Sequence, residues 1–122
     1  MSDARIQAEA VLDELVGRGA IGAGLIGRDG LPILLKFPRP VQEETFSAMA
    51  AALLGASEAA LLEMAEQSPV TAVLEAGRIR LLVSGLDDTH LLVVAAPLGL
   101  DSAKLGTAID AARTRLRTVL GG

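Results

Sequence analysis

Four residues near position 87 have the side-chain types of a hydrolytic triad. Ser84, Asp87, Asp88 and His90 lie within seven positions, and a serine nucleophile, a histidine base and an orienting carboxylate together catalyse acyl transfer. A triad also needs a preorganised pocket with oxyanion donors. These residues instead flank a predicted hairpin turn, where such residue types serve the backbone, and no G-x-S-x-G motif surrounds Ser84. We therefore expect turn residues and no triad.

A second chemical motif is the string GAGLIG at residues 22–27, which satisfies the dinucleotide-binding pattern G-x-G-x-x-G. That pattern binds pyrophosphate where a strand passes through a glycine turn into the N-terminus of a helix. Here a predicted helix precedes the glycines, and a hairpin turn with another strand follows them. We therefore interpret GAGLIG as a strand in which Gly22 and Gly24 allow a helix to pack closely or permit a bulge.

The remaining ionisable residues predict no catalytic, cofactor or metal site. The chain has one histidine and no cysteine, which argues against a zinc site within one chain. The carboxylate pair Glu43–Glu44 occupies adjacent helical positions that do not face each other, and Asp87–Asp88 lies in the predicted turn. The arginines at 113, 115 and 117 suit the negative end of a helix dipole. Arg28 and Arg39 are interpreted as solvated turn residues, because an arginine finger requires a docked nucleotide.

The composition predicts one domain that spans residues 1–122 and a core made of aliphatic side chains. Hydrophobic residues make up 51% of the chain and the mean hydropathy is +0.47, but aromatic residues make up only 2%. A domain of this size has one core and a large surface. So much apolar area is more than one core is expected to absorb, which suggests a protein partner.

The charge balance bears on the kind of partner. A net charge of −4 argues against nucleic acid, which is bound by clustered lysine and arginine. Charged residues are expected to interrupt every apolar stretch before it reaches the length of a membrane span. The opening MSDARIQAEA has no basic region followed by an apolar run, so we expect no secretory signal and a cytoplasmic protein.

Hydrophobic periodicity and turn signals predict an α+β domain with the order α-β-β-α-β-β-β-α. Apolar residues at helical spacing predict helices, and the Asp-Gly pair of the 27–30 turn predicts a hairpin. Tight turns make the five-stranded sheet antiparallel, and helices are expected on both of its faces. The continuously apolar HLLVVAA indicates a central strand covered on both faces. The predicted helices are 3–16, 41–67 and 100–120, and the predicted strands are 21–26, 31–37, 70–75, 78–84 and 90–96.

The long helix at residues 41–67 is apolar nearly all round, which is typical of a helix buried on more than one side. Leu54, Leu61 and Leu62 add to its apolar surface. One stripe is expected to cover the sheet, and it comprises Phe46, Met49, Leu53, Ala56, Ala60 and Met64. Another stripe has small residues three or four positions apart, which lets a second helix approach closely.

These features predict a homodimer. A twofold contact is self-complementary, so the long helix should meet its own copy. If strand 70–75 is at the sheet edge, pairing with its copy satisfies its free backbone groups. The expected dimer interface comprises Ala48, Ala52, Gly55, Ala59, Leu62, Val70, Thr71, Ala72, Val73, Leu74 and Glu75. In a monomer the small stripe is an alanine-rich surface favoured by helix propensity.

Two motifs and the order of elements resemble the roadblock/dynein light chain family, in its prokaryotic MglB-like branch. They are the hairpin G-R-D-G-L-P-I at 27–33 and the run H-L-L-V-V-A-A-P-L-G-L at 90–100. Pro97 stands where the family often has asparagine before L-G-L. The resemblance implies a non-enzymatic dimer with a two-chain sheet, and a regulator or scaffold of a small Ras-like GTPase. It transfers no GTPase-contact residue to this sequence.

Two hypotheses for the function follow. No feature of the sequence supports a third possibility, that the protein is an enzyme. The first is the homodimeric interaction module just described. The alternative is a small-molecule sensor with a pocket between sheet and helix. Such a pocket needs a few convergent polar groups, whereas the inward positions here are plain aliphatics.

Overall fold

The computed structural model describes residues 3–38, 40–67 and 69–121, and its elements follow the predicted order. Element boundaries agree with prediction within two residues, except at the C-terminal end of the long helix. The helices are α1 (Asp3–Gly17), α2 (Glu43–Glu63) and α3 (Ser102–Gly121). The strands are β1 (Gly22–Gly27), β2 (Pro32–Lys36), β3 (Thr71–Ala76), β4 (Ile79–Gly85) and β5 (His90–Pro97).

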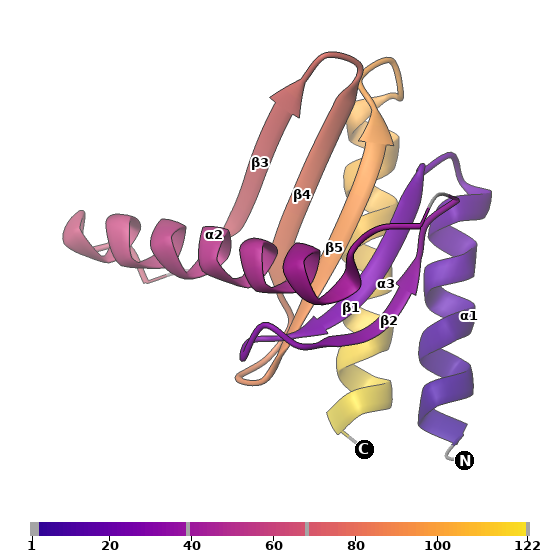
Figure 1. The fold of residues 1–122 in the computed structure, drawn as a ribbon, viewed down its shortest axis with the longest axis horizontal. Helices are drawn as coiled ribbons and strands as arrows, with labels where there is room; N and C mark the ends of the chain where they lie inside the picture. The colour runs from indigo at the N-terminus through magenta and orange to yellow at the C-terminus, as the bar shows by residue number, and fades with distance from the viewer. Residues whose placement is uncertain (1–2, 39, 68, 122) are drawn as a thin grey trace.

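The five strands form one antiparallel sheet in the order β2-β1-β5-β4-β3 (Figure 1). The central strand β5 is buried from Leu91 to Ala96, as its continuous apolar sequence predicts. The β1–β2 hairpin turns at Gly30, whose φ is +88°, and the Asp29 carboxylate accepts a hydrogen bond from the Leu31 N–H at 3.1 Å. Because β2 and β3 stand at the two ends of the strand order, they are the edges of the sheet.

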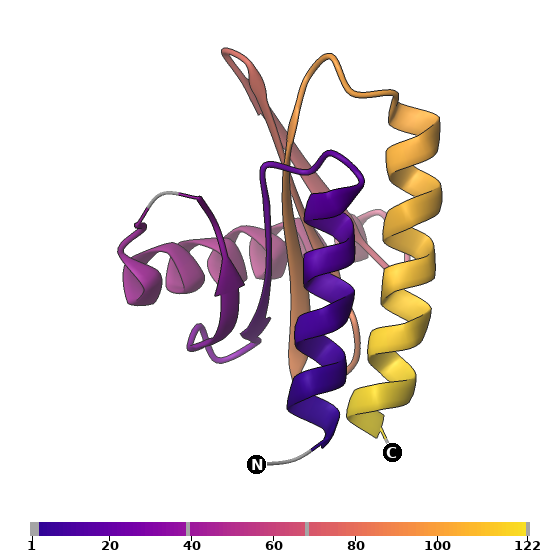
Figure 2. The same ribbon diagram turned by 90° about the vertical axis from the view of Figure 1, so that its right-hand side faces the viewer.

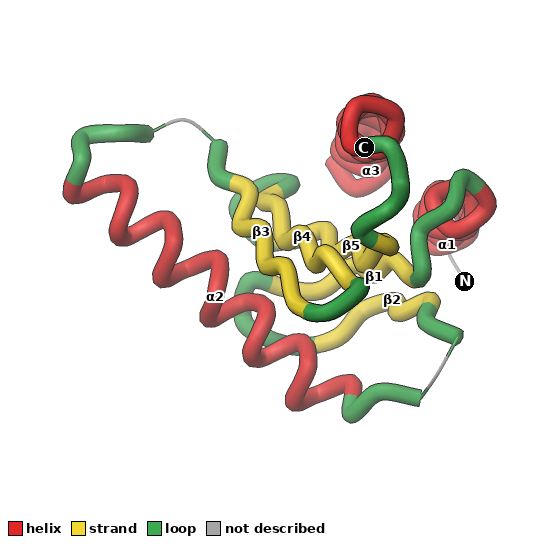
Figure 3. The backbone as a smooth tube through the Cα atoms, turned by 90° about the horizontal axis from the view of Figure 1, so that it is seen from above, coloured by secondary structure: helices red, strands yellow, loops and turns green. Residues whose placement is uncertain are grey.

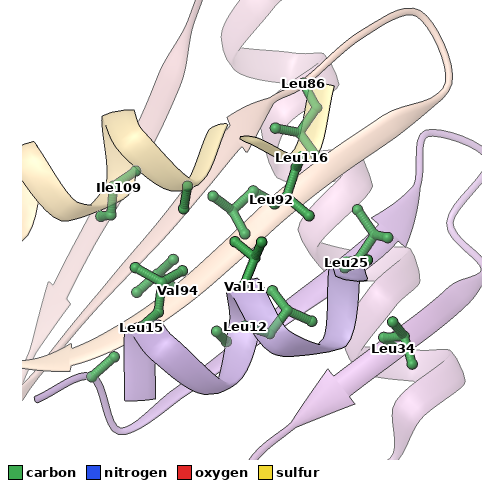
Figure 4. Close-up of a cluster of buried hydrophobic side chains, with 14 of the residues drawn as sticks. Val11, Leu12, Leu15, Leu25, Leu34, Leu86, Leu92, Val94, Ile109 and Leu116 are labelled. Atoms are coloured by element: carbon green, nitrogen blue, oxygen red, sulfur yellow. The ribbon is translucent and has the colours of Figure 1, made fainter. Parts of the chain in front are cut away.

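Helices cover both faces of the sheet. Figure 2 shows α1 and α3 side by side on one face, with α2 crossing the other. Beneath α1 and α3, aliphatic side chains from both helices meet those of the central strands (Figure 4). The largest of them include Leu12, Leu25, Leu92 and Leu116, all nearly inaccessible. The fold is therefore the α+β sandwich expected from the sequence.

The side of α2 that faces the sheet differs from the expected one. Ser47, Ala50 and Leu54 are its buried residues, and they pack toward Ile26, Val83 and Val93. Of the six residues expected on the sheet, only Phe46 and Leu53 are partly buried there. The other four, Met49, Ala56, Ala60 and Met64, do not pack into this core. Because alanine and leucine occur all round this helix, the sequence pattern does not determine its rotation about its axis.

The GAGLIG segment is the buried strand β1, as interpreted from the sequence. A bulge interrupts its pairing with β2 between Leu25 and Ile26. Side chains of the neighbouring hairpin arm, and not a helix, approach the glycines. A Cβ at Gly22 would collide with the Phe37 ring, and one at Gly24 with the Leu35 side chain. At Gly22 a Cβ would also lie 2.9 Å from the Lys36 carbonyl oxygen, so glycine is required there, whereas the flexible Leu35 side chain can move away from a Cβ at Gly24.

Helix α2 ends four residues earlier than expected, at Glu63. The Ala65 and Glu66 N–H groups bond to the Leu62 and Leu61 carbonyls, and Ala65 has a φ of +62°. This is the Schellman arrangement, whose left-handed position normally holds glycine. The expected stop at Ser68 lies outside the described residues.

We predict that Ala65→Gly stabilises the protein by about 0.5–1 kcal/mol, because glycine has no Cβ penalty in the left-handed region. Helix α1 ends in the same arrangement with glycine in place. Gly19 has a φ of +112°, and the Ala20 N–H bonds to the Leu15 carbonyl at 3.2 Å. Urea unfolding of the Ala65→Gly variant measures the effect, with Gly19→Ala as the matched reverse change. A lower midpoint for Ala65→Gly would contradict the prediction.

Candidate protein-interaction surface

The triad-like residues of the β4–β5 turn form no triad in the structure. The Asp87 carboxylate accepts hydrogen bonds from the Thr89 and His90 N–H groups and lies 2.9 Å from His90 Nδ1. The Ser84 side chain is buried, and its hydroxyl pairs with that of Thr71 on β3 at 3.2 Å. Among the hydrogen bonds of the described residues, none joins Ser84 to His90. Asp87 and His90 therefore hold the backbone of the turn, whereas Ser84 lies within β4.

Asp87 makes this turn pH-sensitive. Partial burial raises the pKa of Asp87, but the hydrogen bonds from the Thr89 and His90 backbone and from the His90 ring together lower it below its ordinary value. A depressed carboxyl pKa stabilises the fold above the unfolded-state pKa, about 4, and that stabilisation is lost as the pH falls through the folded value.

Replacing Asp87 with alanine should therefore destabilise the protein above about pH 5, and the difference from wild type should shrink as the pH falls below about 4. Urea unfolding between about pH 3 and pH 7, a range that spans the ordinary carboxyl pKa, measures this difference. Asp88→Ala, in the same turn but without these hydrogen bonds, serves as the control. A difference for Asp87→Ala that stays constant over the whole range would refute the assignment.

Three arginines also hold this turn, and no local signal in the sequence indicated that role. Arg113, Arg117 and Arg28 donate to the Gly85, Leu86 and Asp87 carbonyls at 3.4, 2.9 and 2.8 Å. Arg28 is an exposed turn residue, as interpreted, but its guanidinium also pairs with Glu58 of α2 at 3.0 Å. Arg39 lies outside the described residues. Two arginines of α3 thus act on a turn and not on the helix dipole.

No metal site is found where the structure describes the chain, since it contains no group of three or more histidine, cysteine or carboxylate side chains that could hold an ion. Where the sensor alternative places a ligand, between the sheet and its helices, the described side chains pack into two aliphatic cores. A groove of about 550 Å³ lies elsewhere, between α1 and α3.

The outer face of α2 is a large apolar feature exposed by the described chain. We call Ala48, Ala52, Gly55 and Ala59 the small-residue stripe, and Leu62 follows it three positions later. All five are exposed, and their spacing of four, three, four and three averages about 3.5 residues, the period of a helix–helix seam. A Cβ placed on Gly55 meets no atom within 4 Å. The stripe therefore presents a shallow surface that a second helix fits closely.

Strand β3 lies beside this face as an open edge of the sheet. It pairs with β4 on one side, and no described strand pairs with its other side. Its exposed residues include Val73, at 50%, and Leu74, at 48%. Ala72 is buried under α2, so its side chain does not face a partner. An open, apolar edge is a template for pairing with another strand.

Helix α2 projects past β3. Viewed from above, it crosses the sheet obliquely and its C-terminal end continues beyond the edge strand (Figure 3). This overhang carries exposed Leu62, and exposed Met64 follows directly. A strand added next to β3 lies about 4.8 Å further out, where the overhang already covers one of its faces.

The surface of α2 also carries little charge. Residues 45–62 contain one charged residue, Glu58, which is paired with Arg28. A charge does interrupt this stretch, as expected, but Glu58 is the only one along most of helix α2. By length and composition it is apolar enough to cross a membrane, with a mean hydropathy of 1.5 over an 18-residue window of which 17% is buried. The cores of protein interfaces are likewise depleted of charge.

The five-stranded antiparallel sheet with helices on both faces places the molecule in a class of small α+β domains. The Roadblock/LC7 domain model matches residues 7–96, and the chain therefore belongs to the Roadblock/LC7 domain family. A search of the curated proteins found no match.

Solved bacterial structures share the fold. The gliding protein MglB of Thermus thermophilus is similar at a TM-score of 0.87 and 22% identity, over 98% of this chain and 92% of that one. Myxococcus xanthus MglB gives a TM-score of 0.87 at 16% identity, over 93% and 94% of the two chains. A Roadblock/LC7 domain from Streptomyces avermitilis gives 0.79 at 25% identity, over 93% and 97%. These structures confirm the predicted fold, and the family model confirms the family resemblance stated from the sequence.

Proposed function

We propose that the chain is a non-enzymatic, cytoplasmic homodimer that regulates or scaffolds a small Ras-like GTPase. The proposal rests on the Roadblock/LC7 family membership together with the exposed, nearly uncharged face of α2 beside the open edge of β3. Of these observations, the exposed face of α2 is the main support for a dimer.

The proposed dimer joins two copies about a twofold axis next to β3. The two β3 strands pair along their free edges and make one continuous sheet, while the small-residue stripes of the two α2 helices meet. Each overhang then covers the partner's β3, which removes Leu62 and Leu74 from water. Burial of apolar area is favourable by about 25 cal/mol per Å², so this arrangement stabilises both chains.

Light scattering coupled to gel filtration tests the dimer directly. The expected result is twice the 12.5 kDa chain mass at micromolar concentration. A mass of one chain, with a normal unfolding transition, would show that the outer face of α2 remains in water.

The GTPase proposal needs a separate experiment. The probe is the small Ras-like GTPase encoded nearest to this gene, loaded with GDP or with a non-hydrolysable GTP analogue. Calorimetry with the full chain should show binding that differs between the two nucleotide states, because a regulator acts through differential affinity. Single-turnover GTP hydrolysis then separates the two roles, since an activator raises the rate and a scaffold leaves it unchanged. Absence of binding in both states would overturn the GTPase assignment while leaving the dimer intact.

A further inference from the structure

Helices α1 and α3 line a groove, and both lie on the opposite face of the sheet from α2 (Figure 2). Its volume of about 550 Å³ is within the range of ligand sites in proteins. The floor is aliphatic and includes Val11 and Leu15 from α1 with Leu105 and Ala108 from α3. It is open to solvent along the seam of the two helices. The proposed function does not use this groove.

The shape of the groove fits a helix. Its α3 wall has Ala103, Thr107 and Ala111 at successive four-residue intervals, which is the row that packs against a neighbouring helix. Small side chains along that row leave room for a close approach. The wall from Ala103 to Arg115 is about 18 Å long, or about three helical turns. A binding site for a small amphiphile typically encloses most of the ligand's surface. This groove is open along its seam and would leave part of such a ligand in water.

The charge of the rim indicates the chemistry of the occupant. Arg18, Lys104 and Arg115 line the groove with one carboxylate, Glu14, although the chain has a net charge of −4. Glu14 pairs with both arginines, and hydrogen bonds from Arg115 and Arg18 lower its pKa, so it stays ionised at neutral pH. Lys104 forms no ion pair with any residue that the structure describes. Three cations therefore face one anion around an aliphatic floor.

We propose that the α1–α3 groove binds an amphipathic helix of a partner protein, with an apolar stripe flanked by acidic residues. The apolar stripe packs on lining residues that are at least partly exposed, such as Leu100, Ala108 and Ala111, and the acidic residues face Lys104 and the two arginines. This is the helix-in-groove mode of recognition, with anchors at helical spacing. The surface is separate from α2 and β3, so its occupancy does not depend on the proposed dimer or GTPase.

The experiment is a selection from a displayed library of helical peptides about 16 residues long, which span the wall of the groove, with the apolar and flanking positions varied. The full chain is the target, and Ala111→Trp, which fills the open groove without changing its charge, is the counter-target. Selected peptides are then measured by fluorescence anisotropy at low and high salt, about 50 and 300 mM NaCl. We expect acidic amphipathic sequences whose Kd rises at least about tenfold on Lys104→Glu and rises with salt.

Controls separate the alternatives. Arg78→Glu makes the same type of charge change at the β3–β4 turn and should leave the peptide Kd unchanged. Peptides that are neutral or basic, or that bind Ala111→Trp as well as wild type, would overturn the proposal. Displacement of the peptide by micromolar dodecanoate would identify a small aliphatic acid as the ligand. If the wild-type chain forms a tetramer that Lys104→Glu abolishes, the occupant of the groove is a second copy of the chain. Either of these two results would also overturn the proposal.

Discussion

Replacing Gly55 with arginine should leave a folded but monomeric chain. In the protomer, a side chain at this position meets open space, and arginine has a higher helix propensity than glycine by about 0.5–1 kcal/mol. The isolated fold should therefore become slightly more stable. In the dimer, the same guanidinium lies in the seam between two α2 helices, where a buried, unpaired charge costs about 3–5 kcal/mol. We expect the dimer Kd to rise at least about 100-fold.

Gly106→Arg is the matched control, because Gly106 is also an exposed helical glycine with no atom within 4 Å of its Cβ position. It lies on α3, away from the proposed interface, so this variant should remain dimeric. Sedimentation velocity over a concentration series measures both. Ala52→Glu, one turn earlier on the stripe, should behave like Gly55→Arg. An unchanged dimer in both stripe variants would place the interface elsewhere.

Leu54→Ala should destabilise the fold by about 2–5 kcal/mol, the usual cost of removing a buried leucine side chain. Leu54 is fully buried between α2 and the sheet, beside Val83 and Val93 of the inner strands. The loss should detach α2 from the sheet before the other core, beneath α1 and α3, is disturbed. Urea unfolding followed by circular dichroism measures the total effect, and hydrogen exchange locates it on α2.

Leu62→Ala tests the exposed side of α2, just as Leu54→Ala tests its buried side. Leu62 is 57% exposed in the protomer, so the monomer should lose no more than about 0.5 kcal/mol. If α2 pairs with its copy, however, Leu62→Ala should weaken the dimer. Equal losses of monomer stability for Leu54→Ala and Leu62→Ala would contradict the rotation of the helix described above.

Local sequence signals predicted most of the fold. HLLVVAA predicted the doubly covered strand β5, and the Asp29–Gly30 pair predicted the first hairpin, because each signal depends on neighbouring residues alone. The phase of α2 was not predictable, since alanine and leucine surround the helix and even Ser47 is fully buried. The end of α2 at Glu63 was not predicted, because alanine seldom occupies the left-handed position that Ala65 takes just after the helix.

The candidate site was predicted less completely. The small-residue stripe followed from spacing within one helix, and the structure places all of it in solvent. Arg28 joins a hairpin to Glu58, thirty positions later in the chain, and no local pattern reports such a contact. The α1–α3 groove depends on how two helices at opposite ends of the sequence meet, so only the assembled fold shows it.

The position of β5 has a consequence for how partners combine. This strand is buried on both sides and divides the molecule into two halves with separate aliphatic cores. An occupant of the α1–α3 groove and a protein bound on the α2 side would be kept apart by the thickness of the sheet. Neither would block the other's access, and one dimer would carry two such grooves on its outer flank. With both proposed partners bound, a chain of 122 residues would bring two different molecules together at one place.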